Sequence, residues 1–161
     1  MKILVVYYSL DGNTKLIAEA VAEAAQADTM ELVLKNKKIK AGSFMKYFWG
    51  GRQVMMKEKP ELEPLEKDPA DYDIIFIGTP VWAWNFTPAI SSFISSTKIS
   101  DKKIALFCCH GGGMKNTFDN LAEALADNQI IGKIDFKEPL KNGPQECVKM
   151  VKDWTVKIIS N

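Results

Sequence analysis

Three short segments of the sequence combine residue types that can bind a small anionic or aromatic ligand. The first reads Ser9-Leu10-Asp11-Gly12-Asn13-Thr14 and lies between an apolar run and a helical pattern. Backbone N–H groups at such a turn can converge on an anion, and the following helix N-terminus adds a favourable dipole. Gly12 permits close approach of the backbone, while Ser9 and Thr14 offer hydroxyl donors. The pattern indicates a phosphate site without arginine, or an ordinary helix start capped by Asn13 or Thr14.

The second segment is an aromatic loop, Thr79-Pro80-Val81-Trp82-Ala83-Trp84-Asn85-Phe86-Thr87-Pro88. It places three aromatic side chains within five positions, directly after an apolar run. Exposed aromatic rings at the end of a strand are typical of a surface that covers a flat apolar molecule. The alternative is that the rings close the end of the hydrophobic core against the aromatic residues at 44–48.

The third segment is Cys109-His110-Gly111-Gly112-Gly113, whose glycines let backbone N–H groups approach the polar edge of a planar ligand. Esterase oxyanion loops also use His-Gly-Gly-Gly, but they need a G-x-S-x-G nucleophile elbow, which this sequence lacks. A metal site is disfavoured because Cys108 and Cys109 point to opposite faces of a strand and His110 is the only histidine. A catalytic Cys109–His110 pair is a weaker alternative to buried, inert thiols. We therefore expect no metal ion, and the catalytic residues remain unknown.

Composition and charge exclude several classes of protein. Lys and Arg number 21 and Asp and Glu 20, so no global basic field favours nucleic acid. Arg52 is the only arginine, which argues against a site built on guanidinium forks. The phosphate-loop patterns G-x-x-x-x-G-K-[ST] and G-x-G-x-x-G are both missing. Three irregularly spaced cysteines indicate reduced thiols and a cytoplasmic location, and no apolar run reaches the roughly 18 residues of a membrane span.

The elements that must position these segments alternate along the chain between apolar runs and helical patterns. The runs predict strands at residues 3–8, 30–34, 73–78, 103–109 and 131–136. Helical spacing predicts helices at 14–28, 88–96, 118–125 and 148–158. This alternation predicts an α/β fold, a doubly wound parallel sheet with helices on both faces. With 161 residues and no internal repeat or linker, residues 1–161 are expected to form a single domain.

Residues 35–71 are less regular than the rest of the sequence. Apolar residues between Phe44 and Met55 could form an amphipathic helix, which Gly50-Gly51 would weaken or kink. Residues 31–67 contain nine Lys/Arg and five Asp/Glu, a local excess of four positive charges. We interpret the segment as a solvated crossover, with a docking surface near the active edge as the alternative.

Taken in order, the three segments resemble the flavodoxin family over essentially the whole chain. Residues 9–14 look like its phosphate loop S/T-x-T-G-N-T, with Asp11 where threonine is usual. Gly78–Trp82 resembles the flavin-ring loop of short flavodoxin-like proteins, and Gly111–Gly113 resembles the loop that meets the pyrimidine edge. The resemblance implies a five-stranded sheet of order 2-1-3-4-5, a three-layer sandwich in which the three loops share one crevice. It also implies that FMN is bound by Ser9, Leu10, Asp11, Gly12, Asn13, Thr14, Thr79, Pro80, Val81, Trp82, Ala83, Trp84, Asn85, His110, Gly111, Gly112 and Gly113.

Two positions depart from the family pattern. Flavodoxins that stabilise a neutral semiquinone often place a glycine in the ring loop, and residues 80–88 contain none. Asp11 brings a carboxylate next to the expected phosphate, which it would repel if it faced that group. We expect Asp11 to turn outward or to cap local N–H groups instead.

The resemblance implies a cytoplasmic FMN protein that transfers electrons to a redox partner protein or a small-molecule acceptor. The first alternative is an FMN-dependent NAD(P)H:quinone or azo-type oxidoreductase, with a second pocket from Phe44–Arg52 or a partner subunit. The second is a non-catalytic FMN-binding module. Electron-carrying flavodoxins are typically strongly acidic, whereas this chain has a net charge of +1, which keeps the reductase open. We expect a monomer or a homodimer that binds neither nucleic acid nor membrane.

Overall fold

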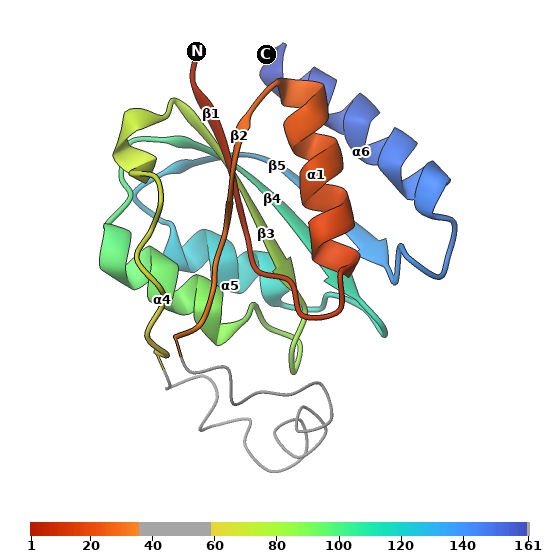
Figure 1. Cartoon of the computed structure of the whole chain (residues 1–161), viewed down its shortest axis with the longest axis horizontal. Coiled ribbons are helices and arrows are strands. Elements are labelled where there is room, and N and C mark those ends of the chain that lie inside the picture. Colours follow the sequence, from red (N-terminus) through yellow and green to blue (C-terminus); the bar gives the residue numbers. More distant parts are fainter. Residues whose placement is uncertain (36–58, 161) are drawn as a thin grey trace.

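Five parallel strands form one sheet in residues 1–35 and 59–160, the part of the chain that the computed structural model describes (Figure 1). The strands lie in the order β2-β1-β3-β4-β5. Their bounds are β1 (Ile3–Tyr7), β2 (Asp28–Glu31), β3 (Ile74–Pro80), β4 (Lys103–His110) and β5 (Gln129–Lys137). This order confirms the predicted doubly wound α/β fold.

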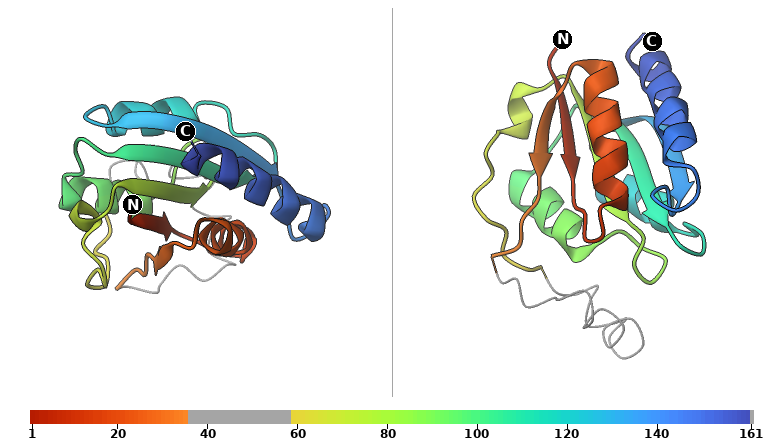
Figure 2. Two further views of the ribbon diagram at one scale, coloured as in Figure 1. Left: turned by 90° about the horizontal axis from the view of Figure 1, so that it is seen from above. Right: turned by 45° about the vertical axis from the view of Figure 1, so that its right-hand side comes forward.

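Helices cover both faces of this sheet. They are α1 (Asn13–Ala25), α4 (Pro88–Thr97), α5 (Thr117–Ala124) and α6 (Pro144–Ile159), with a short 3-10 turn η1 (Pro69–Asp71) before β3. Helices α1 and α6 lie side by side on one face, and α4 and α5 lie on the other (Figures 1 and 2). The result is the three-layer sandwich that the strand–helix alternation predicts.

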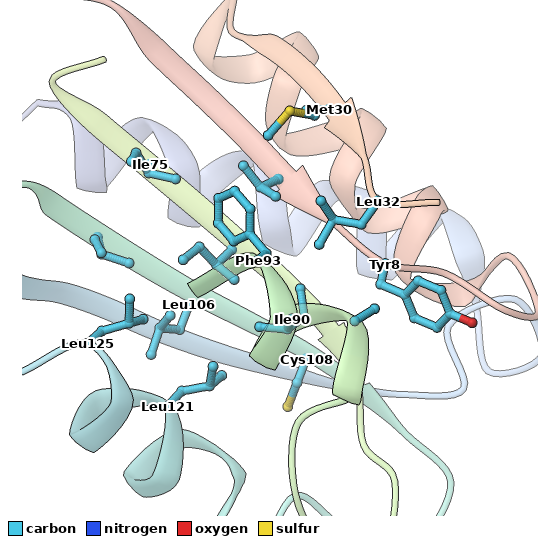
Figure 3. Packing of buried hydrophobic residues seen from close by; sticks show 14 of the residues in the cluster. Tyr8, Met30, Leu32, Ile75, Ile90, Phe93, Leu106, Cys108, Leu121 and Leu125 are labelled. Atoms are coloured by element: carbon cyan, nitrogen blue, oxygen red, sulfur yellow. The ribbon is translucent and has the colours of Figure 1, made fainter. Parts of the chain in front are cut away.

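The strand residues alternate between two hydrophobic clusters, one under each helical layer. In β1, Ile3, Val5 and Tyr7 belong to the cluster with α1 and α6, whereas Leu4 and Val6 belong to the cluster with α4 and α5. Figure 3 shows the second cluster, in which side chains of α4 and α5 meet those of the central strands. Burial on both faces explains why the central strands read as continuous apolar runs.

The predicted boundaries differ most from the structure at the end of α1, at both ends of β2 and at the start of α6, which begins at Pro144 instead of residue 148. Helix α1 ends at Ala25 because Gln26 adopts a left-handed conformation, with φ at 49°, and its N–H caps the carbonyls of Ala22 and Glu23. The chain therefore turns early, and β2 spans Asp28–Glu31 instead of 30–34. The spacing of apolar residues cannot predict that a glutamine adopts the left-handed conformation and ends a helix.

A short antiparallel ribbon follows β2. Residues 33–35 pair with residues 61–63 around Leu34 and Leu62, and two backbone hydrogen bonds of 2.8 and 3.0 Å close the ribbon. The predicted amphipathic helix and the docking surface fall mostly on residues 36–58, which lie outside the described residues. In the described ranges no helix combines the length and apolar character that a membrane crossing needs.

One glycine in the sheet makes room for an aromatic ring at the centre of the fold. Gly78 of β3 lies opposite Phe107 of β4, and a Cβ at Gly78 would come within 2.2 Å of that ring. Phe107 is fully buried, so the ring has no solvent-filled space to move into. Gly78 therefore leaves room for the Phe107 ring against β3, near the edge where the loops begin.

Candidate functional site

The carboxyl ends of β1, β3 and β4 meet at one edge of the sheet. The parallel register pairs Tyr7 with Gly78 and Gly78 with Phe107, so the loops that follow these strands are neighbours. Figure 1 shows the three loops together at the lower edge of the sheet. In an open α/β sheet this edge, at the point where the strand order reverses, is the usual place for a ligand.

Two adjoining hollows lie along this edge. The first, of about 170 Å³, is lined by Asp11, Asn13, Pro80, Val81, Trp82, Cys109, His110, Gly111 and Glu138. The second, of about 240 Å³, is lined by Val81, Ala83, Trp84, His110, Gly111, Gly112 and Gly113. They share Val81, His110 and Gly111, so together they run from the first loop to the glycine loop. A larger depression at the opposite end of β4 and β5 is broad and open, and it contains none of the residues singled out above.

The first loop folds back on the N-terminus of α1. Gly12, the N-cap residue, has φ at 92°, a conformation that glycine adopts without strain. The Ser9 hydroxyl accepts hydrogen bonds from the backbone N–H groups of Gly12 and Lys15, each at 3.2 Å. The Asp11 carboxylate accepts from the Asn13 backbone N–H at 3.1 Å and from its Nδ2 at 2.9 Å. The prediction that Asp11 caps local N–H groups is therefore confirmed.

Thr14 carries a buried hydroxyl at the floor of this loop. The residue is fully buried, and apart from the neighbouring Cys109 thiol its oxygen has no hydrogen-bond partner in the described ranges. Burial raises the pKa of that thiol to about 12, although the Thr14 hydroxyl acts in the opposite direction. A thiol is a weak partner, and a buried hydroxyl without a good one destabilises the fold. The hydroxyl and the helix N-terminus both suit an anion at this position.

Residues 82–85, which we call the aromatic turn, form a two-residue reverse turn of type I′. Trp82 and Asn85 exchange two backbone hydrogen bonds of 2.9 and 3.0 Å. The central residues Ala83 and Trp84 have φ at 50° and 62°, in the left-handed region. A type I′ turn requires this conformation, which is normally supplied by Asn-Gly. The chain therefore accepts backbone strain at two consecutive residues beside the second hollow.

Two buried polar side chains hold the aromatic turn in place. The Asn85 Oδ1 accepts hydrogen bonds from the Phe86 backbone N–H at 2.9 Å and from Asn120 Nδ2 at 3.0 Å. The Thr79 hydroxyl accepts from the Thr87 backbone N–H at 3.1 Å. Both residues were predicted to bind the ligand, and the structure places them behind the turn rather than among the lining residues.

The aromatic rings of this loop lie in different environments. Trp82 is 7% exposed and meets the Tyr8 ring edge-on, with the centroids 5.7 Å apart. Phe86 packs against the hydrophobic cluster under α4 and α5. Trp84 is 40% exposed beside the second hollow, and the Lys115 ammonium lies 3.8 Å from its ring centroid. Trp82 and Phe86 therefore close the end of the hydrophobic core, whereas the Trp84 ring faces outward.

The glycine loop is held by the single histidine. The Gly113 N–H donates to His110 Nδ1 at 2.9 Å, and His110 Nε2 lies 2.9 Å from Asp135 Oδ2. Because Nδ1 accepts, the ring proton of neutral His110 belongs on Nε2, where it donates to Asp135. A Cβ at Gly111 or Gly112 would meet nothing within 4 Å, so the loop is open toward the hollow.

The structure brings most of the predicted site residues to the two hollows. Ser9, Leu10, Gly12 and Thr14 belong to the first loop without lining either hollow. Sequence reasoning missed Glu138, which follows β5 and lines the first hollow. The loop after β5 is tied to the first loop by a 3.0 Å hydrogen bond from the Leu140 N–H to Asn13 Oδ1, across 127 positions of sequence. No local pattern in the sequence signals that contact.

Comparison with known proteins identifies relatives of the same fold. A family model described as Flavodoxin matches residues 2–155. A candidate flavoprotein from Bacteroides uniformis ATCC 8492 has a TM-score of 0.80 and 25% identity, with 95% of this chain and 96% of that chain covered. A second from Bacteroides eggerthii DSM 20697 has a TM-score of 0.77 and 23% identity, with 98% of both chains covered. A flavoprotein from Lactobacillus acidophilus NCFM, solved in complex with FMN, has a TM-score of 0.67 and 22% identity over 90% of this chain and 98% of that one.

Proposed function

This chain belongs to the flavodoxin family, and on that premise we propose that it binds FMN at the edge formed by β1, β3 and β4 and transfers electrons. The observation that carries the proposal is the convergence there of a helix N-terminus, an exposed tryptophan and an open glycine loop. These three features match the phosphate, the flat ring system and the polar edge of a flavin. The bound flavin supplies the redox chemistry, and the protein supplies binding, orientation and electrostatics.

The residues of the first loop fit the phosphate. The N-terminus of α1 favours an anion, and the buried Thr14 hydroxyl has only the Cys109 thiol as a partner within the described residues. No arginine is needed, because backbone N–H groups and hydroxyls donate the hydrogen bonds. This agrees with a chain whose single arginine is Arg52.

The residues of the second hollow fit the ring system. Trp84 offers a partly exposed aromatic surface, and Gly111 and Gly112 offer backbone N–H groups without side chains in the way. His110 and Asp135 hold that loop through Gly113. Together they orient a planar ligand and keep water from part of its surface.

We propose a redox partner protein or a small-molecule acceptor as the destination of the electrons, and a cytoplasmic location. The three cysteines are free, which is consistent with a reducing compartment. The pocket suggested for NAD(P)H at Phe44–Arg52 lies outside the described residues. The reductase is therefore one outcome of the test and is not proposed separately.

A flavin titration of the purified apoprotein tests the proposal. We expect saturable FMN binding at one site per chain, with flavin fluorescence quenched by Trp84, and stepwise reduction spectra that report the flavin potentials. Steady-state assays with NADH or NADPH and a quinone accompany the titration. Sustained turnover would replace the electron carrier with a reductase, and a protein that binds no FMN would refute both.

A further inference from the structure

We infer that Asp11 competes with the ligand phosphate for the N-terminus of α1, and so determines how strongly the site prefers FMN to riboflavin. The inference rests on the proposed function, because it concerns the same site. Asp11 would be a specificity-determining residue that acts on the phosphate end alone.

The contacts of the first loop carry the inference. The Asp11 carboxylate binds both nitrogens of Asn13, at 3.1 and 2.9 Å, and Ser9 Oγ binds the N–H groups of Gly12 and Lys15. Side chains of the loop therefore already take three of the backbone donors that a phosphate would use. A helix N-terminus favours an anion, and in this chain Asp11 supplies that anion internally.

The charge of Asp11 is not cancelled by a bound cation in the described ranges. Lys15, on the first turn of α1, pairs with Glu31 at 3.2 Å. The Lys141 ammonium is hydrogen-bonded to Glu138 at 2.6 Å. That hydrogen bond and, to a smaller extent, the charge of Asp11 raise the pKa of Lys141. Among the described residues, Lys15 and Lys141 are paired with Glu31 and Glu138, so neither forms an ion pair with the carboxylate that an entering phosphate would meet.

Asp11 also has a fixed partner, which makes displacement costly. The Asn13 amide donates to Asp11 and at the same time accepts from the Leu140 N–H at 3.0 Å, so its orientation is set from both sides. A phosphate must either tolerate Asp11 where it is, with repulsion, or displace it and break two hydrogen bonds. Either route weakens binding of the phosphorylated ligand.

The ring end of the ligand should not respond to Asp11. The second hollow is lined by Trp84, His110 and the three glycines, and Asp11 is not among its lining residues. A change at Asp11 should therefore alter the affinity for FMN and leave the affinity for riboflavin nearly unchanged. The ratio of the two dissociation constants isolates the effect.

The test measures both dissociation constants by fluorescence titration for the wild-type protein and for Asp11→Asn. The amide keeps an acceptor oxygen for the Asn13 N–H and removes the charge. We expect FMN to bind about tenfold more tightly and riboflavin to change less than about twofold, since the lost repulsion acts only on the phosphate. Asp119→Asn is the charge-matched control, because Asp119 is 83% exposed and pairs with Lys133 on β5. It should change neither constant.

A second variant and a stability measurement make the test independent of how well one protein folds. Asp11→Thr also removes the charge and should shift the ratio in the same direction. Both variants should lower the Tm of the apoprotein by about 1–4 °C, because the anion at the N-terminus of α1 is lost. Tighter FMN binding together with a less stable apoprotein is the signature of competition.

The possible outcomes separate the inference from the proposed function. If FMN binds the wild-type protein and the ratio is unchanged in both variants, the inference is wrong and the function stands. If the variants lose affinity for FMN, Asp11 helps to hold the phosphate, and the inference is reversed. If neither flavin binds the wild-type protein, the proposed function fails and the inference fails with it.

Discussion

The aromatic turn offers a sharp test of the backbone geometry of the site. Ala83 is held at φ 50° in the first central position of a type I′ turn, and Trp84 follows at 62°. A Cβ in the left-handed region is crowded by its own backbone, whereas glycine has no such conflict. The change Ala83→Gly should therefore stabilise the protein, although glycine usually does the opposite.

The expected change in the free energy of unfolding is the difference between relief of backbone strain and the entropy of the unfolded chain. The left-handed conformation costs an alanine about 1–2 kcal/mol, and this strain disappears with glycine. Glycine is more flexible in the unfolded chain, which costs about 0.5–1 kcal/mol. Ala83 is only partly buried, so loss of its methyl group adds little. The net expectation is a gain of about 0.5–1 kcal/mol, or a rise in Tm of about 1–4 °C.

Urea and thermal unfolding of the apoprotein measure this change. The matched control is Ala122→Gly, the same substitution inside α5 at a residue without positive φ. There glycine should destabilise by about 1 kcal/mol, because only the entropy term remains. Equal losses of stability in the two variants would refute the geometry assigned to the aromatic turn.

Three further changes test other parts of the structure. Gly12→Val should abolish FMN binding and leave most of the fold intact, because a β-branched residue does not tolerate φ at 92°; circular dichroism and a flavin titration measure this. Gly78→Ala should destabilise by at least about 1–3 kcal/mol in urea, since its Cβ would lie 2.2 Å from the buried Phe107 ring. The pKa of the Tyr72 hydroxyl is raised to about 12, mainly by burial and further by its hydrogen bond to Asp28 and by nearby acidic charge. The native state therefore holds that proton more tightly than the unfolded chain, so stability should fall between about pH 10 and 12, and less so in Tyr72→Phe.

Each of these expectations has a distinct contrary result. FMN affinity that survives in Gly12→Val would count against the phosphate end of the site. A Gly78→Ala protein as stable as the wild type would mean that the Phe107 ring does not pack directly against Gly78. If stability falls equally at alkaline pH in Tyr72→Phe, then titration of the Tyr72 hydroxyl does not contribute to that loss.

The architecture was largely predictable from sequence because its signals are local. Apolar runs marked β1, β3, β4 and β5 but overlapped only the end of β2, and helical spacing marked α1, α4, α5 and α6. The strand order came from the family resemblance, since alternation alone does not specify which strands are neighbours. The end of α1 was misjudged because the left-handed Gln26 leaves no trace in the apolar pattern.

The site was predictable as a set of loops, but not as an arrangement of side chains. The sequence placed three aromatic residues together and left open which of them faced a ligand. The structure distinguishes them because Trp82 meets Tyr8, whereas Trp84 lies at the tip of a turn anchored by the Asn85–Asn120 hydrogen bond. These partners belong to other parts of the fold, so they cannot be predicted from the residues next to the turn.

The α/β alternation, the three segments predicted to bind a ligand and the local capping by Asp11 could all be inferred from the amino-acid sequence, because each depends on residues a few positions apart. The contact of Asp135 with His110, the place of Glu138 beside the first hollow and the hydrogen bond from Leu140 to Asn13 are set by the folded arrangement of the strands and loops. The two groups of features differ in the distance along the chain over which their interactions act. Capping and periodicity act within a turn or two of chain, while burial and long-range hydrogen bonds depend on which strands the fold sets side by side.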